Sequence, residues 1–402
     1  MHGQALAQSE LCGGLKRCYS LADTKQGARH RNVLYCSRIL CRLPISNNVD
    51  KKTAIIAGAS GLIGRRIADH LLSTGKWNVV GLARKPPPTR NMSWIAVDLS
   101  NGDDCSRKLA GVDKVSHIFY AARFDHPEGQ PEPIEANAAM LGNLVEVLKR
   151  SPALEHVHAV HGSKYYGHQL GPVPAPMRED SPRARNRNFY FVQEDYLARS
   201  SRGARWSYST SRPHAFCDPA VDHPRSAGLV FAVYAAIQRE LGLRFDFPGG
   251  DAGYEAHTQF TDLGLLARAV TWMATEPRCA NQSFNVVNGD YPRWRELWMR
   301  LAAWLEIEVG APRKFSLAAY MADKAAVWDR VVAKHGLRKT QLHSLVLWTY
   351  GDYQLRPDWE VMSSMAKARA LGFDDSVDSY DMFRRQIENY RAENIIPAGT
   401  AR

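Results

Sequence analysis

The sequence predicts an α/β fold in which a doubly wound parallel sheet of Rossmann type carries a smaller, mostly helical C-terminal lobe. Short apolar runs rich in β-branched residues alternate with amphipathic stretches of helical length from residue 53 onward. A glycine-rich segment stands between the first apolar run and the first amphipathic stretch. Helical patterns dominate the last third of the chain. Strands that alternate with helices at this spacing are joined by right-handed crossovers, which place the strands parallel in one sheet.

Each predicted element rests on its own pattern. Strands are expected where apolar, β-branched or aromatic residues form short runs, at 53–57, 77–82, 94–97, 114–120, 156–160, 205–211 and 282–287. Helices are expected where apolar residues recur at helical spacing, at 62–73, 134–150, 230–241, 263–276, 294–305 and 380–391. The later strands are expected to complete the sheet that the earlier strands begin.

Composition and charge exclude two classes of partner. The chain has 402 residues, of which 45% are hydrophobic, so it can bury a sizeable core. No stretch approaches the roughly 18 consecutive apolar residues of a membrane-spanning helix, so we expect no integral membrane segment. Of the formal net charge of +11, residues 1–50 contribute +4 through seven Lys or Arg against three acids. The remaining charge is spread along the chain without basic runs among aromatics, so we expect no nucleic-acid partner.

The first 51 residues differ in composition from the rest. They contain four of the seven cysteines, Cys12, Cys18, Cys36 and Cys41, which are spaced too loosely for a zinc ribbon, and we predict no metal site. We interpret residues 1–51 as a disordered or transit-like N-terminal extension, or as the result of a wrongly chosen start codon. The other cysteines are scattered, as in a reducing compartment. We therefore expect a cytoplasmic protein, with organelle targeting by the extension as the alternative.

A glycine-rich motif, GASGLIG at 58–64, follows the first predicted strand and opens the first predicted helix. Glycines at this place let the chain turn tightly, let a pyrophosphate approach the backbone amides and let the helix pack close to the strand. The N-terminus of the helix also favours an anion. The motif therefore predicts dinucleotide binding rather than a purely structural turn, and the expected contacts are Gly58, Ser60, Gly61, Leu62, Ile63 and Gly64.

Two cations, Arg84 and Lys85, follow the second predicted strand. NAD-binding proteins usually carry an acid here for the ribose 2′-hydroxyl, whereas a cation suits a 2′-phosphate. The predicted cofactor is therefore NADPH, and the alternative is that these are solvated loop charges. Asp98 and Leu99, after the third predicted strand, fit the turn that flanks the adenine, although Asp98 could instead cap a helix.

Residue spacing alone does not identify a catalytic pair. Short-chain dehydrogenases normally place a Tyr four residues before a Lys on one helix, so that the ammonium lowers the pKa of the phenol. Tyr320 and Lys324 have this spacing, but they lie far downstream of the sheet-forming segments, so we interpret them as a solvent-facing pair. Four residues after Tyr190 the chain has Glu194, which cannot serve as the cation.

Several motifs together resemble the progesterone 5β-reductase/iridoid synthase-like (PRISE-like) branch of the extended short-chain dehydrogenase/reductase family, from residue 53 to about residue 397. The resemblance is carried by the glycine motif, Arg84, Asp98, HGSKYYG at 161–167, NFYFVQED at 188–195, RP at 212–213, VYAAI at 233–237 and FNVVNGD at 284–290. In that family the catalytic Lys comes from the loop after a strand, and the catalytic Tyr is the first Tyr of an Asn-Phe-Tyr-Tyr motif. The resemblance therefore implies Lys164 and Tyr190.

The resemblance implies reduction of the activated C=C bond of an enone or enal, with hydride passing from NADPH to the β-carbon. Tyr190 would stabilise the enolate by hydrogen bonding, and Lys164 would lower the pKa of Tyr190 and hold the nicotinamide ribose. Tyr190 itself and Phe216 complete the expected cofactor contacts. The expected partner is a small apolar carbonyl substrate, and the protein is expected to be a monomer or homodimer.

The chain departs from the family pattern at three positions. Phe191 stands where the family often has a second Tyr, which leaves the catalytic phenol in place but alters how a substrate carbonyl is held. Ala122 and Arg123 stand where plant members tend to have Thr and Trp. The specificity of plant members is therefore not transferred to this chain.

These motifs also suggest a division of the chain. Residues 52–201 would form the NADP-binding Rossmann domain, residues 202–292 would supply strands to the sheet between helices of the substrate lobe, and residues 293–402 would complete the helical C-terminal substrate lobe. The same fold also supports an NAD(P)-dependent carbonyl reductase or a sugar-nucleotide epimerase. A third alternative is an NADPH-sensing regulatory protein without catalysis.

We predict that deletion of residues 1–50 leaves folding and turnover intact, so that the melting temperature is unchanged. The composition of this segment offers too little apolar surface to offset the entropy lost on ordering it. Thermal unfolding of the full chain and of the truncated chain would test this, and a truncated protein that precipitates or melts earlier would contradict it.

Overall fold

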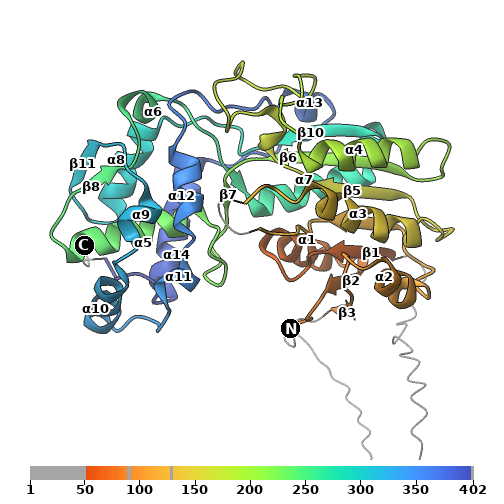
Figure 1. Ribbon diagram of the computed structural model, residues 1–402, viewed down its shortest axis with the longest axis horizontal. Coiled ribbons are helices and arrows are strands. Elements are labelled where there is room, and N and C mark those ends of the chain that lie inside the picture. Colours follow the sequence, from red (N-terminus) through yellow and green to blue (C-terminus); the bar gives the residue numbers. More distant parts are fainter. Residues whose placement is uncertain (1–50, 88–91, 127–129, 400–402) are drawn as a thin grey trace, which may run out of the picture. The chain divides into compact units, whose positions relative to one another are not determined.

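Seven parallel strands form one central sheet in the order β10-β6-β5-β4-β1-β2-β3 (Figure 1). The structure is a computed structural model that describes residues 51–87, 92–126 and 130–399. The strands of this sheet are β1 (Lys52–Ala57), β2 (Trp77–Ala83), β3 (Ser93–Ala96), β4 (His117–Tyr120), β5 (His156–Val160), β6 (Ser207–Pro213) and β10 (Gln282–Val286). The order reverses between β1 and β4, which is the place where ligands bind in open parallel sheets.

Alternating side chains of β1 supply the cores on both faces of the sheet. Ile55 pairs in register with Val80 of β2 and with Ile118 of β4. Ile55 packs with the hydrophobic cluster on one face, and its neighbour Ile56 packs with the cluster on the other. Both side chains are fully buried. A strand covered on both faces has a nearly continuous apolar run, which explains the sequence pattern at this point.

Helices cover both faces of the sheet. On one face α1 (Leu62–Ser73) packs against α7 (Leu263–Thr275). On the other, α3 (Ile134–Leu148) packs between α2 (Gly102–Leu109) and α4 (Phe189–Ser200). The buried residues of α1, among them Leu62, Ile67 and Leu71, recur at helical spacing. The fold is therefore the doubly wound parallel α/β arrangement that the sequence predicts.

The remaining elements include a largely helical lobe with its own aromatic core. Trp298 of α8 stacks on Phe245 of β8 with ring centroids 4.1 Å apart, and its indole donates a hydrogen bond to the Phe245 carbonyl oxygen. Phe231 of α5 contacts Trp298 edge-on. The lobe and its connections contain α5 (Ala227–Glu240), β8 (Phe245–Phe247), α6 (Asp251–Glu255), α8 (Trp294–Trp304), β11 (Val309–Pro312), α9 (Leu317–Met321), α10 (Ala325–His335), α11 (Leu342–Leu345), α12 (Trp348–Leu355) and α14 (Ser379–Ala392).

Two parallel strand pairs lie outside the central sheet, β8 with β11 and β7 (Phe216–Cys217) with β9 (Thr261–Asp262). Three short helical turns complete the described elements, η1 (Ser163–Tyr166), η2 (Pro277–Cys279) and α13 (Ala366–Ala370). No helix in the described ranges is long and apolar enough to cross a membrane.

The predicted strands and helices are confirmed, with small differences at their ends. The strand expected at 114–120 begins at His117, and the helix expected at 134–150 ends at Leu148. Almost all of the expected extension at 1–51 lies outside the described residues. The described residues all belong to one compact unit, and the domain boundaries drawn within it remain predictions.

Histidines and serines of β5 and β6 form a buried polar ladder. His156 makes hydrogen bonds with Ser207 and Ser209, both at 2.8 Å. His158 makes hydrogen bonds with Ser209 at 2.8 Å and with Ser211 at 3.0 Å. Burial lowers the pKa of His156 to about 3 and the pKa of His158 well below its usual value. These imidazoles are therefore neutral in the folded protein.

We predict that His158→Asn makes the free energy of unfolding less dependent on pH between pH 7 and pH 5. The unfolded chain protonates this imidazole below about pH 6.5 and the folded chain does not, so His158 favours unfolding increasingly as the pH falls. Urea unfolding at both pH values would measure the difference, with the exposed His343→Gln as a control that keeps the wild-type dependence. An equal pH dependence in His158→Asn and wild type would contradict the prediction.

Candidate active site

The glycine-rich turn brings β1, α1 and the end of β4 into close contact. Gly58 has φ +78°, and a Cβ on it would lie 2.8 Å from the carbonyl oxygen of Ala121. A Cβ on Gly64 would lie 2.3 Å from the carbonyl oxygen of Gly58. Neither position therefore tolerates a side chain without movement of the backbone. The turn lies where the strand order reverses, as a dinucleotide site requires.

Gly61 begins α1 without a side-chain cap. Its φ and ψ are extended, and no side chain in the described part of the chain accepts a hydrogen bond at this cap. The side chains of Leu62 and Ile63 pack into the core beside the turn, whereas Ser60 is exposed. Backbone N–H groups at an uncapped helix start suit a pyrophosphate, so this turn fits a dinucleotide.

Two arginines of α1 are paired with the segment that follows β7. Arg65 binds the carboxylate of Asp222 through two hydrogen bonds of 2.6 and 2.9 Å. Arg66 binds the buried carboxylate of Asp218 at 2.5 and 2.8 Å. Sequence reasoning missed both pairs, because the carboxylates lie more than a hundred residues downstream without a recognisable spacing.

Arg84 and Lys85 are both exposed directly after β2. Hydrogen bonds from Ser100 hold the pKa of Asp98 below its usual range, and the charge of Arg84 acts in the same direction. Asp98 does not cap a helix, since Asn101 caps α2 by accepting a hydrogen bond of 3.0 Å from the Asp104 N–H. Leu99 is buried. Arg84 and Asp98 are thus near enough to interact electrostatically, and the cation at the end of β2 remains accessible.

Tyr190 lies in the first turn of α4, which Asn188 caps by accepting a hydrogen bond of 3.0 Å from the Tyr190 N–H. Its ring stacks on that of His161, with centroids 4.9 Å apart and an interplanar angle of 24°. A Cβ on Gly162 would lie 3.1 Å from the phenol oxygen. Gly162 therefore provides the space in which the Tyr190 hydroxyl approaches the end of β5.

Lys164 lies in η1, the turn that follows β5, and is largely buried. Its ammonium lies 5.2 Å from the ring centroid of Tyr353 on α12. The charges of Arg123 and Glu132 act on Lys164, Tyr190 and Tyr353 alike. The structure therefore brings the two predicted catalytic side chains into one electrostatic environment, together with Tyr353.

Burial controls the protonation of this cluster. Burial raises the pKa of the Tyr190 phenol to about 12, although the charge of Arg123 acts in the opposite direction. Burial also lowers the pKa of the Lys164 ammonium, and Arg123 lowers it further. Desolvation is the largest influence on the Tyr190 pKa, and the role of Lys164 toward the phenol remains a prediction. Tyr190 is a protonated phenol at neutral pH.

Tyr353 is a site residue that sequence reasoning missed. It makes a hydrogen bond of 3.3 Å with His168, which contacts Ser163 at 3.1 Å, and Ser163 contacts His214 at 2.6 Å. These hydrogen bonds connect α12 to Ser163 of η1 and to His214 after β6. No spacing in the sequence could reveal it, because α12 reaches η1 only through the tertiary fold.

Phe216 was expected to contact the cofactor. Phe216 lies in β7 and packs against the cluster that contains Leu62, beside the glycine-rich turn.

Tyr320 is half-buried and donates a hydrogen bond of 2.8 Å to Gln238, so it does not face solvent as expected. Its ring packs against the lobe core, with its centroid 6.4 Å from that of Tyr234 on α5. The Lys324 ammonium lies 4.9 Å from its ring centroid, and this pair is structural.

A sequence model of the family described as "PRISE-like Rossmann-fold domain" matches residues 98–397. An (S)-8-oxocitronellyl enol synthase of Nepeta racemosa is 32% identical over 366 residues, which cover 86% of this chain and 91% of the relative. A 3-oxo-Delta(4,5)-steroid 5-beta-reductase of Arabidopsis thaliana is 31% identical over 368 residues, which cover 86% and 94%.

The fold also matches solved structures. A short-chain dehydrogenase/reductase superfamily protein of Agrobacterium tumefaciens, with bound NAD, superposes with a TM-score of 0.60 at 14% identity, over 85% of this chain and 97% of that one. At this identity the likeness concerns the fold alone. The match over three quarters of the chain, together with the two relatives, shows that the protein belongs to the PRISE-like Rossmann-fold family.

Proposed function

We propose that this oxidoreductase-type enzyme uses NADPH to reduce the activated C=C bond of a small apolar enone or enal. The observation that carries the proposal is the position of the Tyr190 phenol beside Gly162 at the carboxyl edge of the sheet, with Lys164 in the turn that follows the same strand. The names of the relatives support the reaction class, since one is a reductase of 3-oxo-Delta(4,5)-steroids.

Tyr190 would donate a hydrogen bond to the substrate carbonyl oxygen. When bound, the cofactor supplies the hydride that reaches the β-carbon of the substrate. Negative charge then gathers on the carbonyl oxygen, and a donor that remains protonated stabilises that charge. A phenol with a pKa of about 12 meets this requirement throughout the neutral range. The enolate would then take a proton from water at its α-carbon to give the saturated product, so Tyr190 need only donate a hydrogen bond.

Lys164 would act from η1, the turn that follows β5. Its ammonium would hold the nicotinamide ribose and add positive charge near the developing enolate. Desolvation strengthens such a charge interaction because the surroundings screen it less than water does. Arg123 and Glu132 modify this field at the same place.

The surroundings of Tyr190 support an apolar substrate. Tyr190, Phe191 and Trp359 pack against one hydrophobic cluster that also contains Met177 and Val361. The Trp359 indole donates its hydrogen bond of 3.0 Å to the His168 carbonyl oxygen, so its polar group is already satisfied. Side chains of this kind offer a substrate mainly apolar contacts.

We predict that Arg84→Ala weakens NADPH binding much more than NADH binding. Arg84 would meet the 2′-phosphate with a charge-assisted contact worth about 1.5 to 3 kcal/mol, which NADH cannot make. Fluorescence titration of both cofactors would measure the two dissociation constants. The exposed Arg150→Ala is the matched control, and it should change neither. Equal weakening for both cofactors would show that Arg84 does not discriminate between them.

We predict that Tyr190→Phe lowers kcat for enone reduction by roughly 10² to 10³ while NADPH affinity stays nearly unchanged. The hydroxyl acts on charge that develops only in the transition state. Lys164→Ala should lower kcat and weaken NADPH binding, because the ammonium would touch the ribose as well. An NADPH-oxidation assay with cyclic enones, enals and simple aldehydes would measure turnover.

The double variant Tyr320→Phe with Lys324→Ala is the control for the catalytic assignment. It removes the pair with the ordinary spacing and should keep wild-type turnover. An inactive double variant alongside a fully active Tyr190→Phe would refute the assignment. Absence of turnover with every enone would favour the regulatory alternative, and tightly bound NAD(H) in the purified protein would favour an epimerase.

A further inference from the structure

Glu194 lies on α4 one turn beyond Tyr190, and four side chains donate hydrogen bonds to its carboxylate. The residue is buried, with 8% of its surface exposed. Its two carboxylate oxygens accept hydrogen bonds from Arg212 at 3.1 Å, Arg183 at 2.9 Å, the Tyr165 hydroxyl at 2.7 Å and the Ser283 hydroxyl. Both oxygens are therefore fully used within the protein.

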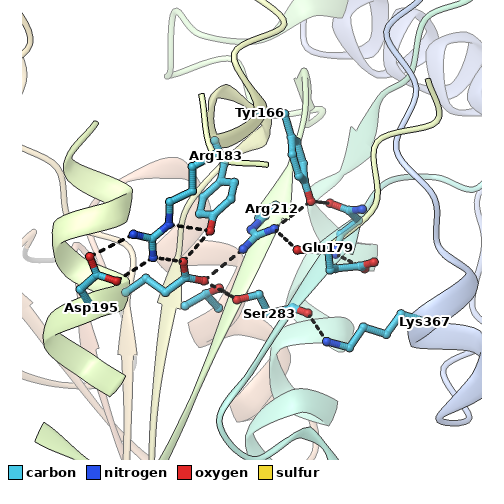
Figure 2. A network of polar contacts seen from close by, with 11 residues as sticks. Tyr166, Glu179, Arg183, Asp195, Arg212, Ser283 and Lys367 are labelled. Carbon is cyan, nitrogen blue, oxygen red and sulfur yellow. Dashed lines mark hydrogen bonds and ion pairs between the residues drawn. The ribbon is translucent and has the colours of Figure 1, made fainter. Parts of the chain in front are cut away.

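Arg212, near the end of β6, is the buried partner of Glu194, with 2% of its surface exposed. Its guanidinium carbon lies 3.4 Å from the ring centroid of Tyr165. It also donates hydrogen bonds to the Tyr166 hydroxyl at 3.0 Å and to the Glu179 carbonyl oxygen at 3.1 Å (Figure 2). A planar guanidinium can stack and donate in this way at the same time, which an ammonium cannot.

Tyr165 and Tyr166 directly follow Lys164 in η1. The Glu194–Arg212 pair therefore contacts the turn that carries Lys164. Glu194 itself belongs to the helix that carries Tyr190. His161 lies beside the same helix, because its ring stacks on that of Tyr190. One buried ion pair thus connects the two side chains to which the proposed function gives the chemistry.

The pair is charged in the folded protein. Burial alone would raise the pKa of the Glu194 carboxyl, but Arg212, His161 and the hydrogen bonds from Ser283 and Tyr165 bring it down to about 2. Neither charge is free to take part in proton transfer. A buried ion pair also contributes little net stability compared with apolar side chains of the same size. We therefore expect the role of this ion pair to be geometric rather than stabilising.

We propose that Glu194 and Arg212 are positioning residues, which fix the helix of Tyr190 relative to the turn of Lys164 so that the phenol meets the substrate carbonyl while the ammonium meets the nicotinamide ribose. This inference rests on the proposed function. Sites of this kind must hold their reacting groups within about 0.5 Å of the productive geometry. In enzymes with the ordinary spacing one helix fixes both side chains, whereas here Tyr190 and Lys164 lie on separate elements and need a connection between them.

A double-variant comparison tests the proposal. Glu194→Gln keeps the shape of the side chain and removes its charge. We expect it to lower the single-turnover rate of NADPH oxidation with cyclohexenone by about ten- to a hundredfold, with NADPH affinity retained. In the Tyr190→Phe background the same change should alter the rate by less than about twofold, because the group that Glu194 positions is absent. Equal losses in both backgrounds, or no loss in either, would overturn the proposal.

A milder variant covers the case in which Glu194→Gln does not fold. Tyr165→Phe removes one donor to Glu194 and leaves the ring under Arg212, and it should show the same dependence on Tyr190 with a smaller loss. The matched control is His156→Gln, a buried polar change at the amino end of β5, which should lower the melting temperature and leave the single-turnover rate unchanged. A Tyr165→Phe loss that is independent of Tyr190 would contradict positioning.

Failure of the proposed function would look different. In that case Tyr190→Phe by itself would turn over cyclohexenone at the wild-type rate. If Tyr190→Phe is slow and the Glu194 variants lose rate only when Tyr190 is present, both proposals stand. If Tyr190→Phe is slow but the Glu194 and Tyr165 losses do not depend on Tyr190, the positioning role alone is refuted.

Discussion

The close approach of Gly58 to Ala121 and Ala122 is the constraint on which the site depends. A Cβ on Gly58 would lie within 2.9 Å of the backbone of both residues, so β1 and β4 can adjoin here only if position 58 lacks a side chain. This contact lies at the carboxyl edge of the sheet, where the strand order reverses. The glycine-rich turn, the cation after β2 and the η1 turn all follow strands that end at this edge. Because the strands are parallel, the residues after each one gather at the same edge.

Desolvation sets the chemistry that this edge can perform. It raises the pKa of Tyr190 to about 12, so the phenol is a neutral hydrogen-bond donor. It also lowers the pKa of Lys164, so this ammonium releases its proton more readily than that of a solvated lysine. A neutral donor suits a reaction in which negative charge gathers on a carbonyl oxygen and is stabilised there by a hydrogen bond before a proton neutralises it. The carboxylate four residues after Tyr190 occupies the place of the ordinary catalytic lysine, and it pairs instead with Arg212 on β6. The tyrosine and the lysine are thus supplied by different elements, and a buried ion pair connects these elements.

The sequence predicted the sheet and the glycine-rich turn because both depend on local patterns. Apolar runs covered on two faces and glycines between a strand and a helix are visible without tertiary information. The helix α4 was not predicted, because Gln193 and Glu194 lie on its buried face and break the apolar period. Tyr353 and the pairs of Arg65 and Arg66 were also missed, since only the fold brings their partners near. The raised pKa of Tyr190 follows from its burial, which no spacing reveals.

The central claim is that hydride reaches a carbon of the C=C bond while the carbonyl oxygen is held by Tyr190. Turnover of an enone with NADPH deuterated on the transferred position of the nicotinamide, followed by NMR of the product, measures the destination of the hydride directly. The account predicts a saturated ketone or aldehyde with deuterium on the former β-carbon. An allylic alcohol with deuterium on the former carbonyl carbon would contradict it and would identify the protein as a carbonyl reductase.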